Sequence, residues 1–363
     1  MFMSESGFSH IFPAVRGMQA GKPCYVAMCP MRIVPKLFKF DEEEVPPELR
    51  AQRILNRSRV PEIATYLIDN PTNYTLSSLT ASVDAMVSFE PMADTGYGQN
   101  IGTLSIPMDA QILINDGQHR RAAIEQAIRE NPEIGHDNIS VLFYIDEGLS
   151  RSQQMFADLN KHAVRPSDSI STLYDLRDII SDLGRYTQKK VHVFSRLTEL
   201  EKSSISNRST KLFTLSSIKN ATKTLLQKGN KDVVSKEEKG AAVEFWNEVA
   251  VNMSDWQLAV NKKVVTSDLR EQYIHAHAVM LQAMGAVGAD LLTKNEKTWK
   301  KTLNKLKKID WARANNDWEG RAMVQGRISK ARINVLLTGN YIKQHLGLKL
   351  NLVEEEAEKA YKS

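Results

Sequence analysis

The sequence predicts an α+β protein in which a mixed α/β domain is followed by a mainly helical domain. Over the first part of the chain, apolar segments short enough for strands alternate with amphipathic segments, whereas from Asp168 onward the spacing is helical. The charge changes at about the same place. Residues 1–150 contain 12 Lys and Arg against 19 Asp and Glu, and residues 151–363 contain 36 against 24. We therefore expect a mixed domain over residues 1–165 and a basic helical domain over residues 166–363.

Composition narrows the class of protein. A chain of 363 residues is long enough for two domains, and its longest apolar runs are too short to cross a membrane. The N-terminus has no basic region followed by an apolar core, so we expect a cytoplasmic protein with no membrane partner. Cys24 and Cys29 are the only cysteines, and their spacing lacks the further ligands of a closed zinc or iron–sulfur site. We expect no bound metal there.

The first domain is expected to begin with a poorly ordered arm over residues 1–21, followed by short strands that Pro30 and Pro35 interrupt. Pro46-Pro47 opens a helix that carries Arg50, Arg53 and Arg57, and a second helix runs from Ser58 or Arg59 to just before Pro71. Two helices around a tight joint also fit a helix-turn-helix. Neither offers a clear recognition helix, so a helix that packs on the sheet and presents Arg57 and Arg59 to a nearby turn fits better. Further strands are predicted over residues 76–89, 101–106, 112–114 and 139–145.

That turn follows a strand, expected to be central, that ends at Ile114. Asp116-Gly117 forms the turn, and a helix continues to about Arg129. Arg120 and Arg121 lie in the first helical turn, where cations oppose the helix dipole, so a phosphate or a buried carboxylate is needed to explain them. The phosphate or anion site would comprise Gly117, Gln118, His119, Arg120 and Arg121, with Lys161 and Arg165 from beyond the next helix.

Two alternatives stay open at this turn. Asp116, Arg120 and Asn160 would be catalytic if the turn hydrolysed a nucleotide triphosphate with Mg²⁺. Otherwise Asp116 is only a helix cap, and Arg120 pairs with a carboxylate that locks the fold. His119 is expected to stay neutral because two arginines adjoin it.

The residues of the turn resemble a known signature. Asp-Gly-Gln-His-Arg followed by Arg-Ala-Ala, at residues 116–123, is identified as the signature of the DGQHR-domain proteins. With Arg-Val-Pro-Glu-Ile-Ala-Thr-Tyr-Leu at 59–67, Phe-Ala-Asp-Leu-Asn-Lys-His at 156–162 and the overall length, it is similar to the DndB family, encoded with the DNA phosphorothioation (sulfur modification) system. The resemblance covers most of the chain. It implies a repressor that binds DNA at the promoter of the modification genes, not the modifying enzyme.

A more distant similarity is to the ParB/sulfiredoxin-like fold, in which the corresponding turn binds nucleotide phosphates. Sulfiredoxin-type enzymes carry a cysteine where this chain has Gln118. An amide cannot act as a thiolate nucleophile, so this departure excludes sulfiredoxin activity through the turn. It also argues against a role as the sulfur donor.

The helical domain carries two basic clusters. Lysines surround Trp299, Leu303, Leu306 and Ile309, so these apolar residues can dock while most lysines face outward. Farther on, arginines flank Gly320 and Gly326, where arginine suits bidentate phosphate or guanine contacts. Cys29 lies among basic residues and could also contact DNA. The predicted DNA-binding residues are Cys29, Arg32, Lys297, Lys300, Lys301, Lys305, Lys308, Arg313, Arg321, Arg327, Lys330 and Arg332.

The helices expected in this domain cover residues 169–187, 215–228, 236–253, 267–287, 296–308 and 329–346. Taken together, the residues and the resemblance predict a DNA-binding transcriptional repressor that acts as a homo-oligomer on double-stranded DNA. Two other functions stay open: a nucleotide triphosphatase or nucleotide-gated switch, and a scaffold for other sulfur-modification subunits. No cofactor is certain, and a nucleotide triphosphate with Mg²⁺ belongs only to the first of these.

Overall fold

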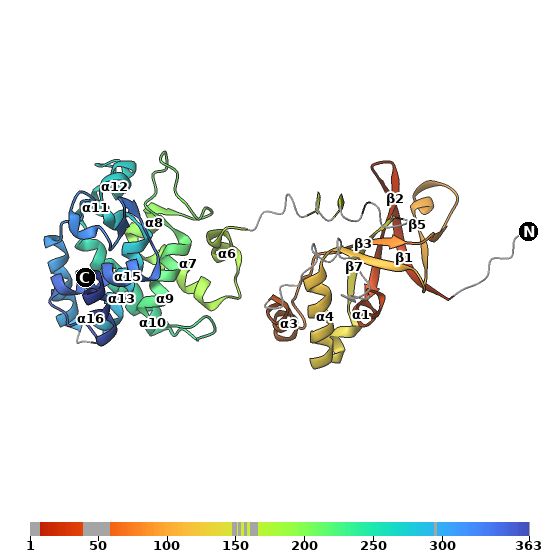
Figure 1. The fold of residues 1–363 in the computed structure, drawn as a ribbon, viewed down its shortest axis with the longest axis horizontal. Helices are drawn as coiled ribbons and strands as arrows, with labels where there is room; N and C mark the ends of the chain where they lie inside the picture. The colour runs from red at the N-terminus through yellow and green to blue at the C-terminus, as the bar shows by residue number, and fades with distance from the viewer. Residues whose placement is uncertain are drawn as a thin grey trace, which may run out of the picture. The chain divides into compact units, whose positions relative to one another are not determined.

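The computed structural model describes residues 8–38, 59–146, 151, 154–155, 158–159, 166–293 and 296–362. The chain divides into two compact units, Met1–Val164 and Arg165–Ser363. The first, coloured red to yellow in Figure 1, is built around a mixed sheet, and the second, green to blue, is mainly helical. The predicted α+β fold class is confirmed.

The first unit contains a seven-stranded sheet in the order β4-β5-β1-β2-β7-β3-β6. All neighbouring strands are antiparallel except β3 and β7, which are parallel. The strands are β1 (Ser9–Gln19), β2 (Lys22–Pro30), β3 (Leu79–Asp84), β4 (Ser88–Pro91), β5 (Ile101–Pro107), β6 (Gln111–Asp116) and β7 (Asn138–Ile145).

The described helices of this unit pack against one face of the sheet. The core on that face joins strand residues such as Phe12 and Phe143 to Leu67 of α3 (Arg59–Asp69), Ile124 of α4 (Gln118–Glu130) and Val34 of α1 (Val34–Leu37). Along β1 and β2, successive side chains alternate between this core and solvent, as the two-residue period of a strand requires. The helices therefore fix which face of β1 and β2 is buried.

The structure differs from three predictions for the first unit. Residues 9–19, placed in a poorly ordered arm, form β1, where Phe12 and Ala14 point into the core and Ile11 and Val15 outward. The strand that precedes the turn, expected to be central, is β6 at the edge of the sheet. Its apolar residues are buried by helices rather than by strands on both sides. The segment 76–89, expected as one half-buried strand, is divided into β3, buried along most of its length between β7 and β6, and the short β4.

The second unit packs its helices around α13 (Ala278–Leu292), most of whose residues are buried. This helix contacts α9 (Leu215–Leu225) and α15 (Arg332–Leu346), and α9 contacts α7 (Ile179–Lys190). Gly285 allows the close approach to α9, because a Cβ at this position would lie 2.3 Å from the carbonyl oxygen of Ala221. The other helices are α6 (Asp168–Tyr174), α8 (His192–Leu197), α10 (Lys236–Val251), α11 (Ser254–Val260), α12 (Thr266–Gln272), α14 (Glu296–Leu303) and α16 (Leu352–Lys362).

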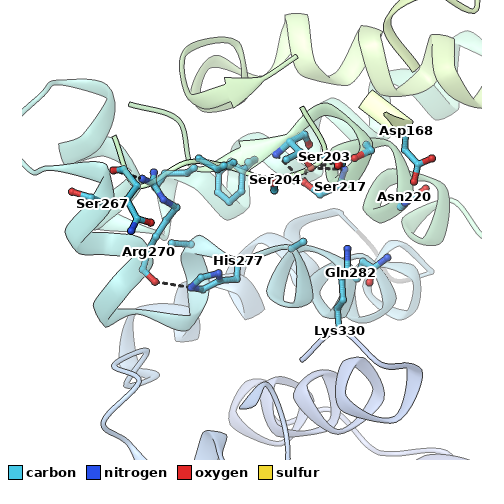
Figure 2. Close-up of a pocket in the computed structure, with 18 of the residues that line it drawn as sticks. Asp168, Ser203, Ser204, Ser217, Asn220, Ser267, Arg270, His277, Gln282 and Lys330 are labelled. Carbon is cyan, nitrogen blue, oxygen red and sulfur yellow. Dashed lines mark hydrogen bonds between the residues drawn. The ribbon is translucent and has the colours of Figure 1, made fainter. Parts of the chain in front are cut away.

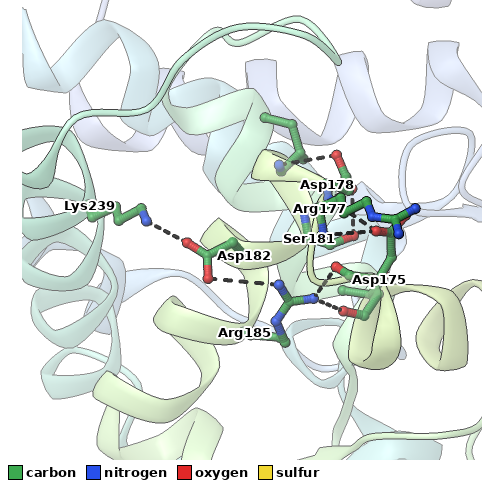
Figure 3. A network of polar contacts seen from close by, with 9 residues as sticks. Asp175, Arg177, Asp178, Ser181, Asp182, Arg185 and Lys239 are labelled. Atoms are coloured by element: carbon green, nitrogen blue, oxygen red, sulfur yellow. Dashed lines mark hydrogen bonds and ion pairs between the residues drawn. The ribbon is translucent and has the colours of Figure 1, made fainter. Parts of the chain in front are cut away.

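Two long helices expected from the sequence are interrupted. The helix predicted over residues 169–187 ends at Tyr174 and resumes as α7, because Asp178 caps the new helix by accepting from the N–H of Ser181 at 2.9 Å. Arg185 then donates to the carbonyl oxygens of Thr172 and Asp175, at 2.6 and 2.7 Å, and so holds the two helices together (Figure 3). The helix predicted over 267–287 is divided into α12, the 3₁₀ turn Ile274–Ala276 and α13. None of the helices in the described residues is both long and apolar enough to cross a membrane.

Candidate functional site

The Asp-Gly-Gln-His-Arg turn joins the edge strand β6 to α4. Gly117, the N-cap of α4, has φ +107° and ψ 15°, and a Cβ there would lie 2.4 Å from Cδ2 of Leu79. Glycine is therefore required both by the backbone conformation and by the lack of space. The Arg120 guanidinium lies beside the same glycine, 3.0 Å from the position that a Cβ would occupy.

The Arg120 guanidinium is largely engaged inside the first unit. It donates to Asp116 at 2.8 Å, to the hydroxyl of Ser77 at 2.5 Å and to the carbonyl oxygen of Ser78 at 3.1 Å. Its side chain is 20% exposed and that of Asp116 is 46% exposed. The buried Nε of the same side chain lacks a partner among the described residues. Arg120 thus pairs with a carboxylate, that of Asp116, and its contacts with Ser77 and Ser78 hold the turn against the segment that leads into β3. Asp116 does not cap α4, because the N-cap is Gly117 and no side chain caps the helix there.

The neighbouring residues of the signature also have internal partners. Arg121 donates to Glu125 at 2.9 Å and to the carbonyl oxygen of Pro35 at 2.8 Å, so its guanidinium ties α4 to α1 instead of joining an anion site at the turn. The Gln118 amide donates to the carbonyl oxygen of Ile114 at 3.0 Å and so closes the end of β6. The sequence predicts that Arg121 binds an anion at the turn, but its guanidinium points to Glu125 and Pro35 instead.

The charges of Arg59 and Arg120 act on His119 at the turn. Burial lowers the pKa of His119, and the charges of Arg59 and Arg120 lower it further, while Asp116 opposes them. The expected neutral imidazole is therefore supported, although burial is the larger cause. Arg59, the first residue of α3, is exposed and has no ion-pair partner within the described residues. Because the charge of Arg59 acts on His119, Arg59 lies near the turn, in agreement with the prediction that its helix presents it there.

Several predicted site residues lie outside the described part of the chain. These are Asn160, Lys161 and Arg165, which the sequence predicts to join the site at the turn, and Arg50, Arg53 and Arg57 of the helix expected after Pro47. The side chain of Lys297 is likewise outside it. Among the residues that are described, no group of three or more His, Cys, Asp and Glu is placed to hold a metal ion.

The lysine-rich segment is arranged as its spacing predicts. Trp299, Leu303 and Leu306 are buried in the core of the second unit. The lysines at its surface divide into two groups. Lys300 pairs with Glu244, and Lys305 donates to the carbonyl oxygen of Leu346 at 2.9 Å, whereas Lys301, Lys307 and Lys308 are exposed and make no ion pair within the described residues. We call these last three residues the lysine face.

The arginines that follow also divide. Arg321 is 5% exposed and donates from both Nη atoms to Glu358 of α16, at 2.5 and 2.8 Å, so its predicted contact with DNA is wrong. Arg313 is engaged with the carbonyl oxygens of Glu271 and Gly326, at 3.1 and 2.8 Å. By contrast, Arg327, Lys330 and Arg332 are exposed and have no ion-pair partners in the described residues. They form a basic hairpin cluster around β10 (Met323–Val324), β11 (Arg327–Ile328) and the start of α15.

Cys29 is not at a surface. It lies on β2 with no exposed area, among the core residues beneath α1, and burial raises the pKa of its thiol to about 12. A neutral, enclosed thiol cannot contact a phosphate backbone, so the prediction that Cys29 binds DNA is wrong. Arg32, two residues after β2, is exposed and contacts Nδ1 of His136 at 3.3 Å. It remains at a surface where an anion could approach.

The second unit also contains a cavity that the sequence did not predict. It has a volume of about 600 Å³ and lies between α9, α12 and α13 and the segment around Ser203, all within residues 168–330. Its lining includes Arg270, His277, Arg313 and Lys330. The only signal in the sequence is indirect, namely the Ser- and Asn-rich joint over residues 203–210, which by itself indicates a connection between helices.

Comparison with known proteins identifies the family. The family model for DndB, described as DNA-sulfur modification-associated, matches residues 12–349, which is nearly the whole chain and includes both units. No curated protein and no solved structure matches it, so the likeness to the ParB/sulfiredoxin-like fold stays a prediction. The chain belongs to the DndB family of DNA-sulfur modification-associated proteins.

Proposed function

We propose that this protein binds double-stranded DNA through the second unit and represses transcription of the DNA phosphorothioation genes. The observation that carries the proposal is the lysine face. Lys301, Lys307 and Lys308 are held outward by buried apolar neighbours, and no carboxylate of the described residues neutralises them. Exposed cations without partners are what a polyanion requires, because each can replace a condensed counterion.

The basic hairpin cluster offers a second set of contacts. Arg327, Lys330 and Arg332 adjoin the N-terminus of α15, and Lys305 fixes the lysine-rich segment to the C-terminus of the same helix. Fifteen residues at 1.5 Å each separate the two ends by about 22 Å. At about 3.4 Å per base pair, this separation corresponds to between six and seven base pairs of duplex. Phosphate contacts at both ends would position the protein without specifying sequence.

The family supports the biological assignment at a coarser level, since it places the protein with DNA sulfur modification. We do not extend the proposal to nucleotide hydrolysis, because the Asp116 carboxylate and the Arg120 guanidinium already engage each other. Repression at a promoter further implies a symmetric homo-oligomer on repeated half-sites.

A salt titration tests the proposal. The full-length protein would be titrated against a duplex that carries the promoter of the modification genes, and against a scrambled duplex of equal length, at several salt concentrations. We expect the logarithm of the association constant to fall linearly with the logarithm of salt for both duplexes, with tighter binding to the promoter. An affinity that does not change between low and physiological salt would contradict contact through the lysine face.

A further inference from the structure

The cavity of the second unit is lined mainly by side chains that carry charge or form hydrogen bonds. They come from segments far apart in the sequence, including the joint around Ser203, the start of α9, α12 and the start of α13 (Figure 2). A volume of about 600 Å³ lies within the range of small-molecule sites. The cavity is therefore large enough to hold a ligand of the size of a sugar phosphate or a nucleoside monophosphate.

The positive charges around the cavity are not neutralised by carboxylates of the described residues. Arg270 donates only to backbone carbonyl oxygens, among them those of Ser206 and Asn207 at 3.0 and 3.1 Å. Arg313 is likewise held by carbonyl oxygens, and Lys330 makes no ion pair in the described part of the chain. Asp168 and Glu271 also line the cavity, but within the described residues they form no ion pair with these cations. Two guanidinium groups are thus fixed in place with their charge uncompensated.

The neutral groups of the lining add hydrogen-bonding capacity. The Nε2–H of His277 donates to the carbonyl oxygen of Arg270 at 2.8 Å (Figure 2). Burial, with smaller contributions from Arg313, His275 and Arg270, lowers the pKa of His277 to about 4, so at neutral pH its Nδ1 is an acceptor. Asn220 and Gln282 supply amide groups. Ala278 also lines the cavity, at the N-terminus of the fifteen-residue helix α13, where backbone N–H groups favour an anion.

We propose that this cavity binds a small phosphomonoester, with Arg313 and Lys330 facing the phosphate and the amides and His277 facing the polar remainder of the ligand. A phosphomonoester carries a charge of about −1.5 to −2 at pH 7, which suits several cations better than a single carboxylate would. Arginine provides paired N–H donors that match phosphate oxygens. The ligand is small and its binding can be measured without DNA, although Lys330 belongs both to this lining and to the basic hairpin cluster.

Calorimetric titration of the full-length protein without DNA tests the site. The probes are ribose 5-phosphate, adenosine 5′-monophosphate, inorganic phosphate, adenosine, and a dinucleotide whose only phosphate is a diester. We expect both phosphomonoesters to bind at one site per chain, adenosine not to bind, and the diester to bind more weakly because it carries a single negative charge. Binding should weaken as the pH falls below about 6, where the phosphomonoester dianion takes up one proton and becomes a monoanion.

Variants locate the binding in the cavity. Lys330→Gln removes a cation of the lining and should weaken both phosphomonoesters about tenfold, which corresponds to the removal of one charged hydrogen bond. Gln282→Glu, nearly isosteric, places a negative charge in the wall and should weaken them at least as much. Arg332→Gln is the matched control, because Arg332 is a neighbouring cation of the same cluster that does not line the cavity. It should leave the affinity unchanged.

Three outcomes would overturn the proposal. The first is that neither phosphomonoester binds more tightly than about 1 mM, a weak affinity for a cavity of this size. The second is that Lys330→Gln and Gln282→Glu, shown to be folded by circular dichroism, bind the probes as the unmodified chain does. The third is that the diester binds more tightly than the monoesters, which would assign the cavity to a nucleic-acid backbone. Because no DNA is present, failure of the repressor proposal would not alter these results.

Discussion

The signature turn of the first unit and the basic surface of the second use their cations in opposite ways. At the turn, Arg120 and Arg121 donate to residues of their own unit and hold secondary-structure elements together. On the second unit, the lysine face and the basic hairpin cluster carry cations that make no ion pair within the described residues. The more recognisable motif therefore has the more structural role, and the less distinctive basic residues are the ones available to a partner.

The same contrast holds for two histidines that lie near arginines. Burial lowers the pKa of both, and nearby arginines lower it further. At His119, however, the Arg120 guanidinium is closed over Gly117 and paired with Asp116, whereas His277 borders a cavity of about 600 Å³. A histidine beside arginines indicates an anion site only where the arginines are not already neutralised. Substitutions in the two units test this distinction.

Within the second unit, Arg321 is the clearest cation committed to the fold. Arg321→Met would leave Glu358 buried without its arginine and should lower the free energy of unfolding by about 3–5 kcal/mol, measured by chemical denaturation. The double variant Arg321→Met/Glu358→Met should recover much of that loss, since neither charge of this pair is then left buried without its partner. Arg327→Met, on the exposed hairpin, should change stability by less than about 0.5 kcal/mol. Equal losses for Arg321→Met and Arg327→Met would remove the distinction between committed and available cations.

The histidine beside the cavity should make stability depend on pH. Because the pKa of His277 is about 4 in the folded chain and about 6.5 when unfolded, the unfolded chain takes up the proton first as the pH falls. The stabilisation is present above pH 6.5 and is lost progressively toward pH 4, by about 3 kcal/mol at 1.4 kcal/mol per unit. His277→Gln should abolish this part of the pH profile, measured by urea denaturation. His119→Gln is the comparison and should remove a smaller part, because His119 keeps a partly exposed position near Asp116.

Glycine substitutions compare the two turns directly. Gly117→Ala combines φ +107° with a contact of 2.4 Å to Leu79, and should lower the free energy of unfolding by about 2 kcal/mol or more. Gly326→Ala has φ +70° but nothing within 4 Å of the added Cβ, so the backbone alone should cost about 1 kcal/mol. Thermal denaturation of both variants gives the difference. If Gly326→Ala were as destabilising as Gly117→Ala, the packing of Arg120 and Leu79 against the turn would contribute nothing.

Much of the first unit and the orientation of the lysine-rich segment could be predicted from the sequence. The turn at Asp116-Gly117, the helix after it, β5 and β7 have local signals, namely a glycine, an apolar stripe and runs of β-branched residues. The orientation of the lysine-rich segment follows from the spacing of its apolar residues. Each of these features depends on neighbours in the sequence, which is why a pattern could reveal it.

The features that the sequence did not reveal depend on contacts between residues that are distant in the chain. Arg321 looks like a surface arginine until Glu358, 37 residues later, is brought against it by α16. Cys29 lies among basic residues in the sequence, but the strand alternation turns its side chain into the core while Arg32 stays outside. The cavity is assembled from segments between Asp168 and Lys330 that share no motif. Sequence spacing alone could not reveal any of these three arrangements.

The smallest expected effect is on DNA affinity when the lysine face is neutralised. Its measurement tests which unit contacts DNA. Replacing Lys301, Lys307 and Lys308 together by Gln should reduce the slope of log affinity against log salt by up to about 3, because each phosphate that is no longer neutralised lowers it by nearly one. At physiological salt, the loss of binding free energy should be less than about 1 kcal/mol per lysine. Lys300→Gln is the matched control, because Lys300 already pairs with Glu244 and should change the slope little. Arg59→Gln examines the turn by the same measurement. If Arg59→Gln lowered the slope and the triple lysine variant did not, the signature turn and not the basic helical unit would be the DNA contact, and the roles of the two units would be exchanged.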